Sequence, residues 1–201
     1  MMDNRTLVLH GLAIKRHSDA NAVAALTGLA KDIVDAELKN AAATGRAVEV
    51  RGAYSLTPLA RVALQASYDL HFAELRESAA FEAAYLGFEK INPDLKSVIT
   101  DWQTMNVRGE RRTNAHTDDD YDNKVIDRLV GVHERVTPVL KALAKDLPRL
   151  SRYADKLEAA LDKAEGGGKE WVSDIHRDSY HTVWFELHEE LLRIMGRERE
   201  E

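Results

Sequence analysis

The sequence predicts a mainly α-helical protein that carries one small β-hairpin near its start. Apolar residues recur at helical spacing along most of the 201 residues, whereas the alternation typical of a strand is confined to "VEVRGAYSLTP", residues 48–58. Three prolines indicate helix starts, because each follows a residue type that caps helices well. The pairs are Thr57-Pro58, Asn92-Pro93 and Thr137-Pro138.

Ten helices account for the helical pattern. Pro148 follows Leu147 and opens a helix without such a cap, and the glycine triplet at 166–168 breaks the chain before the last helix. The expected ranges are about 6–17, 20–27, 30–44, 58–76, 79–91, 93–105, 120–136, 138–146, 148–165 and 178–196.

The first three helices are short, and each has an apolar stripe that predicts a shared core. "TGL", residues 27–29, predicts a sharp turn between the second and the third helix. The stripe residues are Leu9, Leu12 and Ala13, then Ala22, Val23 and Leu26, then Val34, Leu38 and Ala41.

The hairpin follows these helices directly. We expect Val48, Val50, Tyr54 and Leu56 to share one buried face, because a lone two-stranded ribbon is not stable in water. That face requires Val50 to oppose Tyr54 and Val48 to oppose Leu56, which leaves residues 51–53 as a three-residue turn.

Three short helices and a hairpin follow one another in the order of a winged helix-turn-helix. Residues 6–66 resemble the winged helix of bacterial MarR- and PadR-type regulators, with "AVEVRGAYSLTPLARVAL" similar to their wing and the helix after it. The whole chain, including "ITDWQ" and "DSYHTVWFELHEEL", more loosely resembles a winged-helix segment associated with pyruvate, phosphate dikinase-like proteins. The resemblance implies a winged helix over residues 1–66 and a helical dimerisation or effector domain over 67–201.

If the third helix enters a major groove of double-stranded DNA, its outward side chains contact bases and phosphates. The outward positions also include Asp32 and Asp35, which oppose phosphate binding. The expected DNA-binding residues are Lys31, Lys39 and Asn40 on this helix, Arg46 and Arg51 on the hairpin, and Lys15 and Arg16 at the end of the first helix.

Composition limits the class of protein. Residues 1–66 carry eight Lys and Arg against six Asp and Glu, whereas the whole chain has a net charge of −6, so the excess of acid lies in the remainder. No apolar run is long enough to span a bilayer, no export signal is evident, and cysteine is absent, which favours a cytoplasmic protein.

The remaining helices have aromatic stripes that indicate a core or a dimer interface. The interval 106–120, with three arginines and three aspartates, is expected to be a surface loop or else a lid over a ligand. The stripe residues are Val62, Leu64, Tyr68, Phe72 and Leu75, then Phe81, Tyr85 and Phe88, then Leu95, Val98, Ile99 and Trp102, and finally Tyr180, Trp184, Leu187, Leu191 and Ile194.

Three histidines and one aspartate are the candidate ligands for a metal ion. His181 and His188 are seven residues apart in the last helix, and Asp178 and His133 are further candidate ligands. GntR regulators bind a metal with Asp four residues before His, whereas Asp178 precedes His181 by three. We therefore expect polar margins of a core helix rather than a metal, and no cofactor.

The predicted function is DNA binding in transcription control, by a homodimer with a small-molecule effector as a further candidate partner. The alternative is a winged-helix interaction module that does not bind DNA and serves a phosphotransfer enzyme. An enzyme is not expected, because the sequence lacks a nucleophile elbow, a Walker loop, an HExxH motif and a Rossmann glycine pattern.

Overall fold

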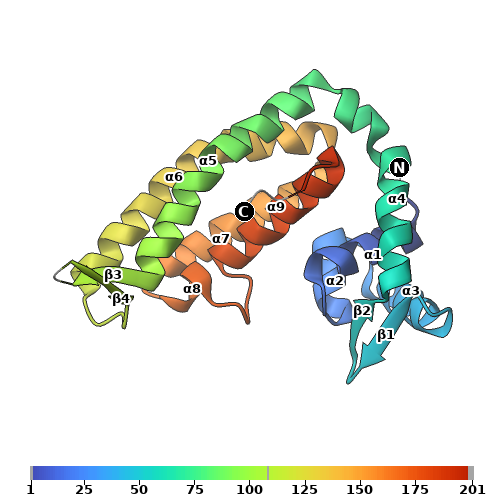
Figure 1. The fold of residues 1–201 in the computed structure, drawn as a ribbon, viewed down its shortest axis with the longest axis horizontal. Helices are drawn as coiled ribbons and strands as arrows, with labels where there is room; N and C mark the ends of the chain where they lie inside the picture. The colour runs from blue at the N-terminus through green and yellow to red at the C-terminus, as the bar shows by residue number, and fades with distance from the viewer. Residues whose placement is uncertain (1, 108, 199–201) are drawn as a thin grey trace. The chain divides into compact units, whose positions relative to one another are not determined.

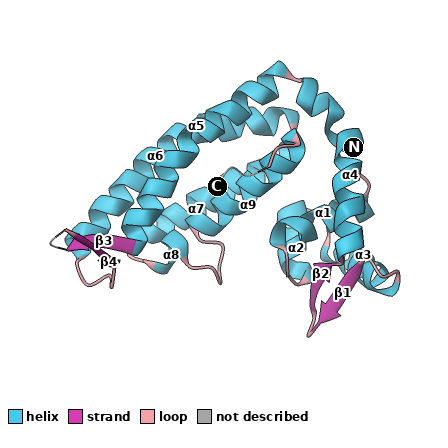
Figure 2. Cartoon of the chain, viewed as in Figure 1, coloured by secondary structure: helices cyan, strands magenta, loops and turns pink. Residues whose placement is uncertain are grey.

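The computed structural model describes residues 2–107 and 109–198. The chain forms two compact units (Figure 1). Unit 1 comprises Met1–Ser78 with His188–Glu201, and unit 2 comprises Ala79–Leu187. The fold is mainly helical, as predicted, with two small hairpins in the described residues rather than one (Figure 2).

Unit 1 begins with three short helices whose ends follow local rules. The helices are α1 (Asn4–Lys15), α2 (Ala20–Thr27) and α3 (Lys31–Ala43). The side chains of Asp3 and Asp19 cap α1 and α2 by accepting from backbone N–H groups three residues later. Gly28 ends α2 with φ +78°, so the predicted sharp turn before α3 is confirmed.

The core of this three-helix group matches the predicted stripes. Val34 and Leu38 of α3 are fully buried, as are Leu12 and Val23. Helices α1 and α2 approach closely at Gly11, where an added Cβ would lie 2.7 Å from Thr27 Cγ2.

Strands β1 (Ala47–Val50) and β2 (Ala53–Leu56) form the predicted hairpin, but its predicted register is wrong. Val50 pairs with Ala53 and Ala47 pairs with Leu56. The turn therefore has two residues, Arg51 and Gly52, both with positive φ, which matches the twist of the strands.

The new register changes which side chains are buried. Ala47, Tyr54 and Leu56 form the buried face, while Val48 and Val50 are 53% and 54% exposed. The physical reason is a bridge to the loop between α1 and α2: Ser18 and Tyr54 exchange two backbone hydrogen bonds, which fixes the face that Tyr54 presents to the helices.

Helix α4 (Pro58–Glu77) follows the hairpin, with Thr57 as its N-cap and Pro58 in its first turn, as predicted. It runs as one helix through residue 66, where the boundary between the two domains was predicted. Leu64, Tyr68 and Phe72 are buried, but the predicted core residue Val62 is 68% exposed, because it lies on the opposite side of the helix.

The end of α9 (Tyr180–Met195) belongs to unit 1. Arg76 of α4 donates from Nε to the carbonyl oxygen of Ile194 at 2.6 Å and so caps the C-terminus of α9. Deeper in the unit, His10 lies between Tyr68 and Glu190, with Nδ1 2.9 Å from Tyr68 Oη and Nε2 3.3 Å from Glu190 Oε1.

Unit 2 is built on two long helices that pack side by side, α5 (Ala79–Gln103) and α6 (Asp119–Asp146) (Figure 1). Between them lie strands β3 (Thr104–Val107) and β4 (Glu110–Thr113), which pair as a hairpin. The unit continues with η1 (Pro148–Leu150), α7 (Ser151–Glu165), α8 (Glu170–Ser173) and the first half of α9.

Two predicted helix starts are wrong, because Pro93 and Pro138 lie inside α5 and α6. The residues before them do not act as caps. Asn92 is buried and accepts a hydrogen bond from Trp184 Nε1 at 3.0 Å, and Thr137 donates back to the carbonyl of His133. Both prolines are exposed, and buried residues before and after them hold each helix in place despite the missing proline N–H.

The expectation of a loop or lid over residues 106–120 is also wrong in its first part. The hairpin β3–β4 occupies 104–113, and the described loop is limited to residues 114–118 before α6. Arg108, one of the three arginines noted in the sequence, lies outside the described residues. Arg112 forms an ion pair with Glu110, two residues earlier in β4.

The predicted aromatic core of unit 2 is confirmed. Phe81, Phe88, Trp102, Tyr180 and Trp184 are each at most 2% exposed. Phe88 and Trp184 stack with ring centroids 4.6 Å apart. Among the described residues, none of the helices has both the length and the apolar character that crossing a bilayer requires.

Candidate functional site

The outward face of α3 and the adjacent hairpin form the candidate site predicted from the sequence. Lys39, Asn40, Arg46 and Arg51 are all exposed, and their side chains make no hydrogen bond or ion pair with the described residues. The local cause is the buried stripe of α3, which turns the rest of its surface outward.

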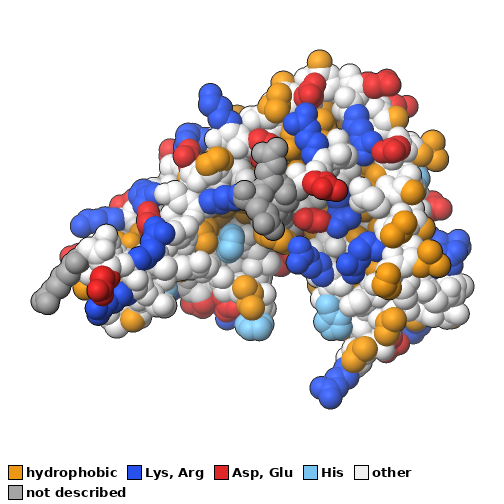
Figure 3. All heavy atoms as spheres, in the orientation of Figure 1, with side chains coloured by type: hydrophobic (Ala, Val, Ile, Leu, Met, Phe, Trp, Pro, Cys, Tyr) orange, Lys and Arg blue, Asp and Glu red, His pale blue; other side chains and the backbone are white. Residues whose placement is uncertain are grey.

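Arg51 occupies the tip of the hairpin. Its φ of +53° places it in the left-handed region, next to Gly52 at +82°. A cationic side chain at this tip projects from the molecule in Figure 3, with hydrophobic side chains beside it on the hairpin. The hairpin therefore presents a guanidinium and the two exposed valines, Val48 and Val50, to solvent.

Lys31 differs from the other predicted contacts, because its charge is already paired. Its Nζ lies 2.5 Å from Asp35 Oδ2, one turn along α3, and this hydrogen bond raises the pKa of Lys31. Asp32 is also exposed on this helix. Lys31, Asp32 and Asp35 together carry a net charge of −1, and the unpaired positive charge lies at Lys39 and on the hairpin.

Lys15 and Arg16 lie at the end of α1. Arg16 is exposed and has φ +66° as the C-cap of the helix, whereas Lys15 is half-buried. Both side chains already interact within the protein. They are consequently less available to an outside partner than Lys39 or Arg51.

The metal candidates do not form a metal centre in the described part of the chain, which contains no group of three or more potential ligands. Asp178 instead forms an ion pair with Lys156 at 2.9 Å, and His133 Nδ1 lies 3.3 Å from Tyr180 Oη. Burial lowers the pKa of His133, so this imidazole is neutral at pH 7. His181 is half-buried and His188 is buried, and both interact within the protein.

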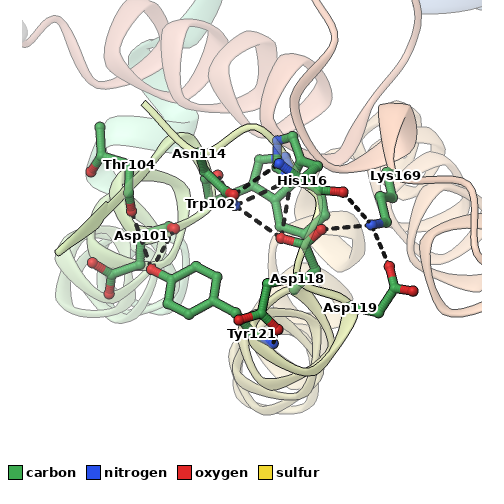
Figure 4. A network of polar contacts seen from close by, with 10 residues as sticks. Asp101, Trp102, Thr104, Asn114, His116, Asp118, Asp119, Tyr121 and Lys169 are labelled. Carbon is green, nitrogen blue, oxygen red and sulfur yellow. Dashed lines mark hydrogen bonds and ion pairs between the residues drawn. The ribbon is translucent and has the colours of Figure 1, made fainter. Parts of the chain in front are cut away.

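A second polar cluster, which sequence reasoning missed, surrounds the buried carboxylate of Asp122 in unit 2. Figure 4 labels its partners Asn114, His116 and Lys169. One oxygen accepts from Asn114 Nδ2 at 2.9 Å and from His116 Nδ1 at 3.1 Å. The other oxygen lies 2.8 Å from Lys169 Nζ. The His116 ring also lies against Trp102, with centroids 4.4 Å apart.

Opposing effects determine the pKa of Asp122 in this cluster. Burial alone would raise the pKa of Asp122, but the hydrogen bonds from Lys169, Asn114 and His116 outweigh it and hold the pKa below its ordinary value. The same contacts raise the pKa of Lys169, chiefly through Asp119 and Asp122. The carboxylate is therefore ionised, with Oδ1 hydrogen-bonded to Asn114 and His116 and Oδ2 in an ion pair with Lys169.

The chemistry of the cluster is that of a structural clamp. Asn114 also donates to the Trp102 carbonyl at 3.1 Å, and its Oδ1 accepts from the His116 backbone, which has φ +55°. Lys169 additionally donates to the His116 carbonyl oxygen at 2.9 Å. These contacts join the end of α5, the loop after β4, the start of α6 and α8 into one rigid corner.

No model of a known protein family, no curated protein and no solved structure matches this chain.

Proposed function

We propose that unit 1 is a winged helix that binds double-stranded DNA in transcription control. The observation that carries the proposal is the exposed set Lys39, Asn40, Arg46 and Arg51 on α3 and its hairpin, whose side chains have no partner among the described residues. Lysine and arginine neutralise phosphates, and asparagine and arginine read base edges in the major groove.

The connectivity of unit 1 supports this proposal. Helix α1 is followed by the Ser18 bridge, then α2, the turn at Gly28, α3, and a hairpin whose second strand pairs with Ser18. This is the order of a winged helix, in which the third helix enters a groove and the hairpin lies beside it. The resemblance of residues 6–66 to MarR- and PadR-type regulators points the same way.

A homodimer is part of the proposal, because α3 and its hairpin in a single chain offer three cations, Lys39, Arg46 and Arg51, that have no side-chain partner among the described residues. Two heads double that charge and allow contact with two half-sites about one helical turn apart. Leu59 and Leu70 of α4 are 80% and 82% exposed, and hydrophobic side chains gather along this helix in Figure 3. Exposed leucines in register on one helix are typical of an interface.

The decisive experiment is fluorescence anisotropy with a mixed-sequence duplex at a series of salt concentrations. We expect measurable binding at low salt and an affinity that falls steeply as salt rises, with Arg51→Ala lowering the log–log slope by about 0.9 for each phosphate contact removed. Arg152→Ala is the matched control, because Arg152 is an exposed arginine of α7.

The absence of binding at low salt, or an unchanged slope in Arg51→Ala, would overturn the proposal. Such a result would favour the second function, a winged-helix module that contacts a protein partner, for example a phosphotransfer enzyme. This second function is supported by Val48 and Val50, whose exposed side chains form an apolar face on the hairpin.

A further inference from the structure

A groove of about 690 Å³ lies within unit 1, along α4 and the C-terminal end of α9. Its volume is in the range of small-molecule sites, and the groove is distinct from the outward face of α3. Arg61, Val62 and Ala66 contribute one wall, and Arg193 and Met195 contribute the other.

Two of the charged residues that line this groove, Arg76 and Asp69, already interact with each other. Arg76 donates to the carbonyl oxygens of Ile194 and Arg193 and to Asp69, the one carboxylate among the lining residues. Asp69 is 83% exposed at its side chain, yet Arg76 holds it. The pair Arg76–Asp69 therefore adds no net charge to the groove.

The remaining charge is positive. The Arg61 guanidinium makes no ion pair or side-chain hydrogen bond with the described residues. Arg193 pairs through Nη2 with Glu189 at 2.6 Å, but its Nε is buried and has no hydrogen-bond acceptor in the part of the chain that the structure describes. The exposed Arg61 guanidinium is therefore the charge in this groove that an anionic ligand can reach.

The same groove offers apolar contacts beside the cations. Val62 is 68% exposed, Ala66 is exposed, and Met195 is half-buried at the end of α9. Methionine adapts its shape to a partner more readily than other apolar side chains. A ligand that uses both features has an anionic head and an apolar chain.

We propose that this groove binds a small amphiphilic anion, whose head group pairs with Arg61 while its apolar chain covers Val62, Ala66 and Met195. The proposal stands independently of DNA binding, because none of these residues belongs to the set on α3 and the hairpin. It gives the full chain a ligand-binding site in the same unit as the proposed reader helix.

Isothermal titration calorimetry of the full chain with octanoate tests this directly. We expect saturable binding of octanoate, at least tenfold weaker binding of acetate, which lacks the chain, and at least tenfold weaker binding of 1-octanol, which lacks the charge. Arg61→Gln removes the unpaired cation at an exposed position and is expected to weaken octanoate binding about tenfold, the usual size for a hydrogen bond to a charged group.

Arg152→Gln serves as the matched control and is expected to bind octanoate like the wild type. A second variant, Val62→Ser, tests the apolar wall and is expected to weaken octanoate several-fold without changing the binding of acetate. The proposal is overturned if octanoate shows no saturable heat, if Arg61→Gln binds it as the wild type does, or if 1-octanol binds equally well.

Discussion

Ser18 and Tyr54 exchange two backbone hydrogen bonds, of 3.1 and 2.8 Å, between the loop after α1 and strand β2. This bridge turns the Tyr54 side chain toward the helices, where it is 7% exposed. His17 Nδ1 lies 2.9 Å from Ser55 Oγ and adds a second tie at the same loop. The hairpin is thus anchored on one face and open on the other.

The anchored face should dominate the stability of unit 1. Tyr54→Ala removes a buried ring and is expected to lower the free energy of unfolding by about 3 kcal/mol. Val50→Ala, at an exposed position of the same hairpin, is expected to change it by less than about 0.5 kcal/mol. Chemical denaturation followed by circular dichroism measures both, and equal losses would contradict the register.

The Asp122 cluster makes a prediction about acid stability. The pKa of Asp122 is below its ordinary value in the folded protein, so its contribution is present above about pH 4 and is lost as pH falls through the folded pKa. At pH 7, Asp122→Asn is expected to destabilise unit 2 by about 3 kcal/mol, since Lys169 loses a buried partner.

Asp119→Asn is the matched control for this cluster, because Asp119 also contacts Lys169 but its side chain is 82% exposed. Its effect on the free energy of unfolding is expected to stay below about 1 kcal/mol at all pH values. Denaturant midpoints between pH 3 and pH 7 give the comparison, and a pH-independent loss in Asp122→Asn would show that its charge is not what stabilises the corner.

The buried hydroxyl of Tyr68 predicts a loss of stability at alkaline pH. Burial raises its pKa to about 12, so the stability that its neutral hydroxyl provides is present below pH 10 and is lost as pH rises toward 12. The difference in tyrosinate absorbance between the wild type and Tyr68→Phe should therefore show no ionisation below about pH 11. An ionisation near pH 10 would place Tyr68 in contact with water.

The Lys31–Asp35 pair predicts a gain of function. Asp35→Asn releases Lys31 and removes a carboxylate from the face of α3, so affinity for a mixed-sequence duplex should rise roughly threefold or more at low salt, with a steeper salt dependence. Asp155→Asn, on α7, changes the net charge equally and should have little effect. Equal gains in both variants would reduce the effect to net charge alone.

The sequence predicts short-range features of this fold well. Helical periodicity located the buried stripe of α3, and Thr57-Pro58 located the start of α4. The same cap rule failed at Pro93 and Pro138, because Asn92 and Thr137 bond elsewhere in the folded protein. The hairpin register failed because it depends on Ser18, 36 residues before its partner Tyr54.

The clusters formed by distant residues had no signal in the sequence. Asp122 and Lys169 are separated by the lengths of α6 and α7, and neither carries a recognisable spacing. Arg61 and Arg193 line the same groove although 132 residues separate them in the sequence. By contrast, the sequence did predict that Lys39 and Arg51 are exposed. The helical wheel gives the outward positions of α3, and the turn of a hairpin lies at the surface.

The central claim, that α3 and its hairpin contact a duplex, is tested most directly by backbone amide NMR during titration with a mixed-sequence DNA duplex at low salt. We expect the amide shifts to concentrate at Lys39, Asn40, Arg46 and Arg51 and to disappear at high salt. Shifts confined to Ala79–Leu187, or no shifts at any salt concentration, would contradict it.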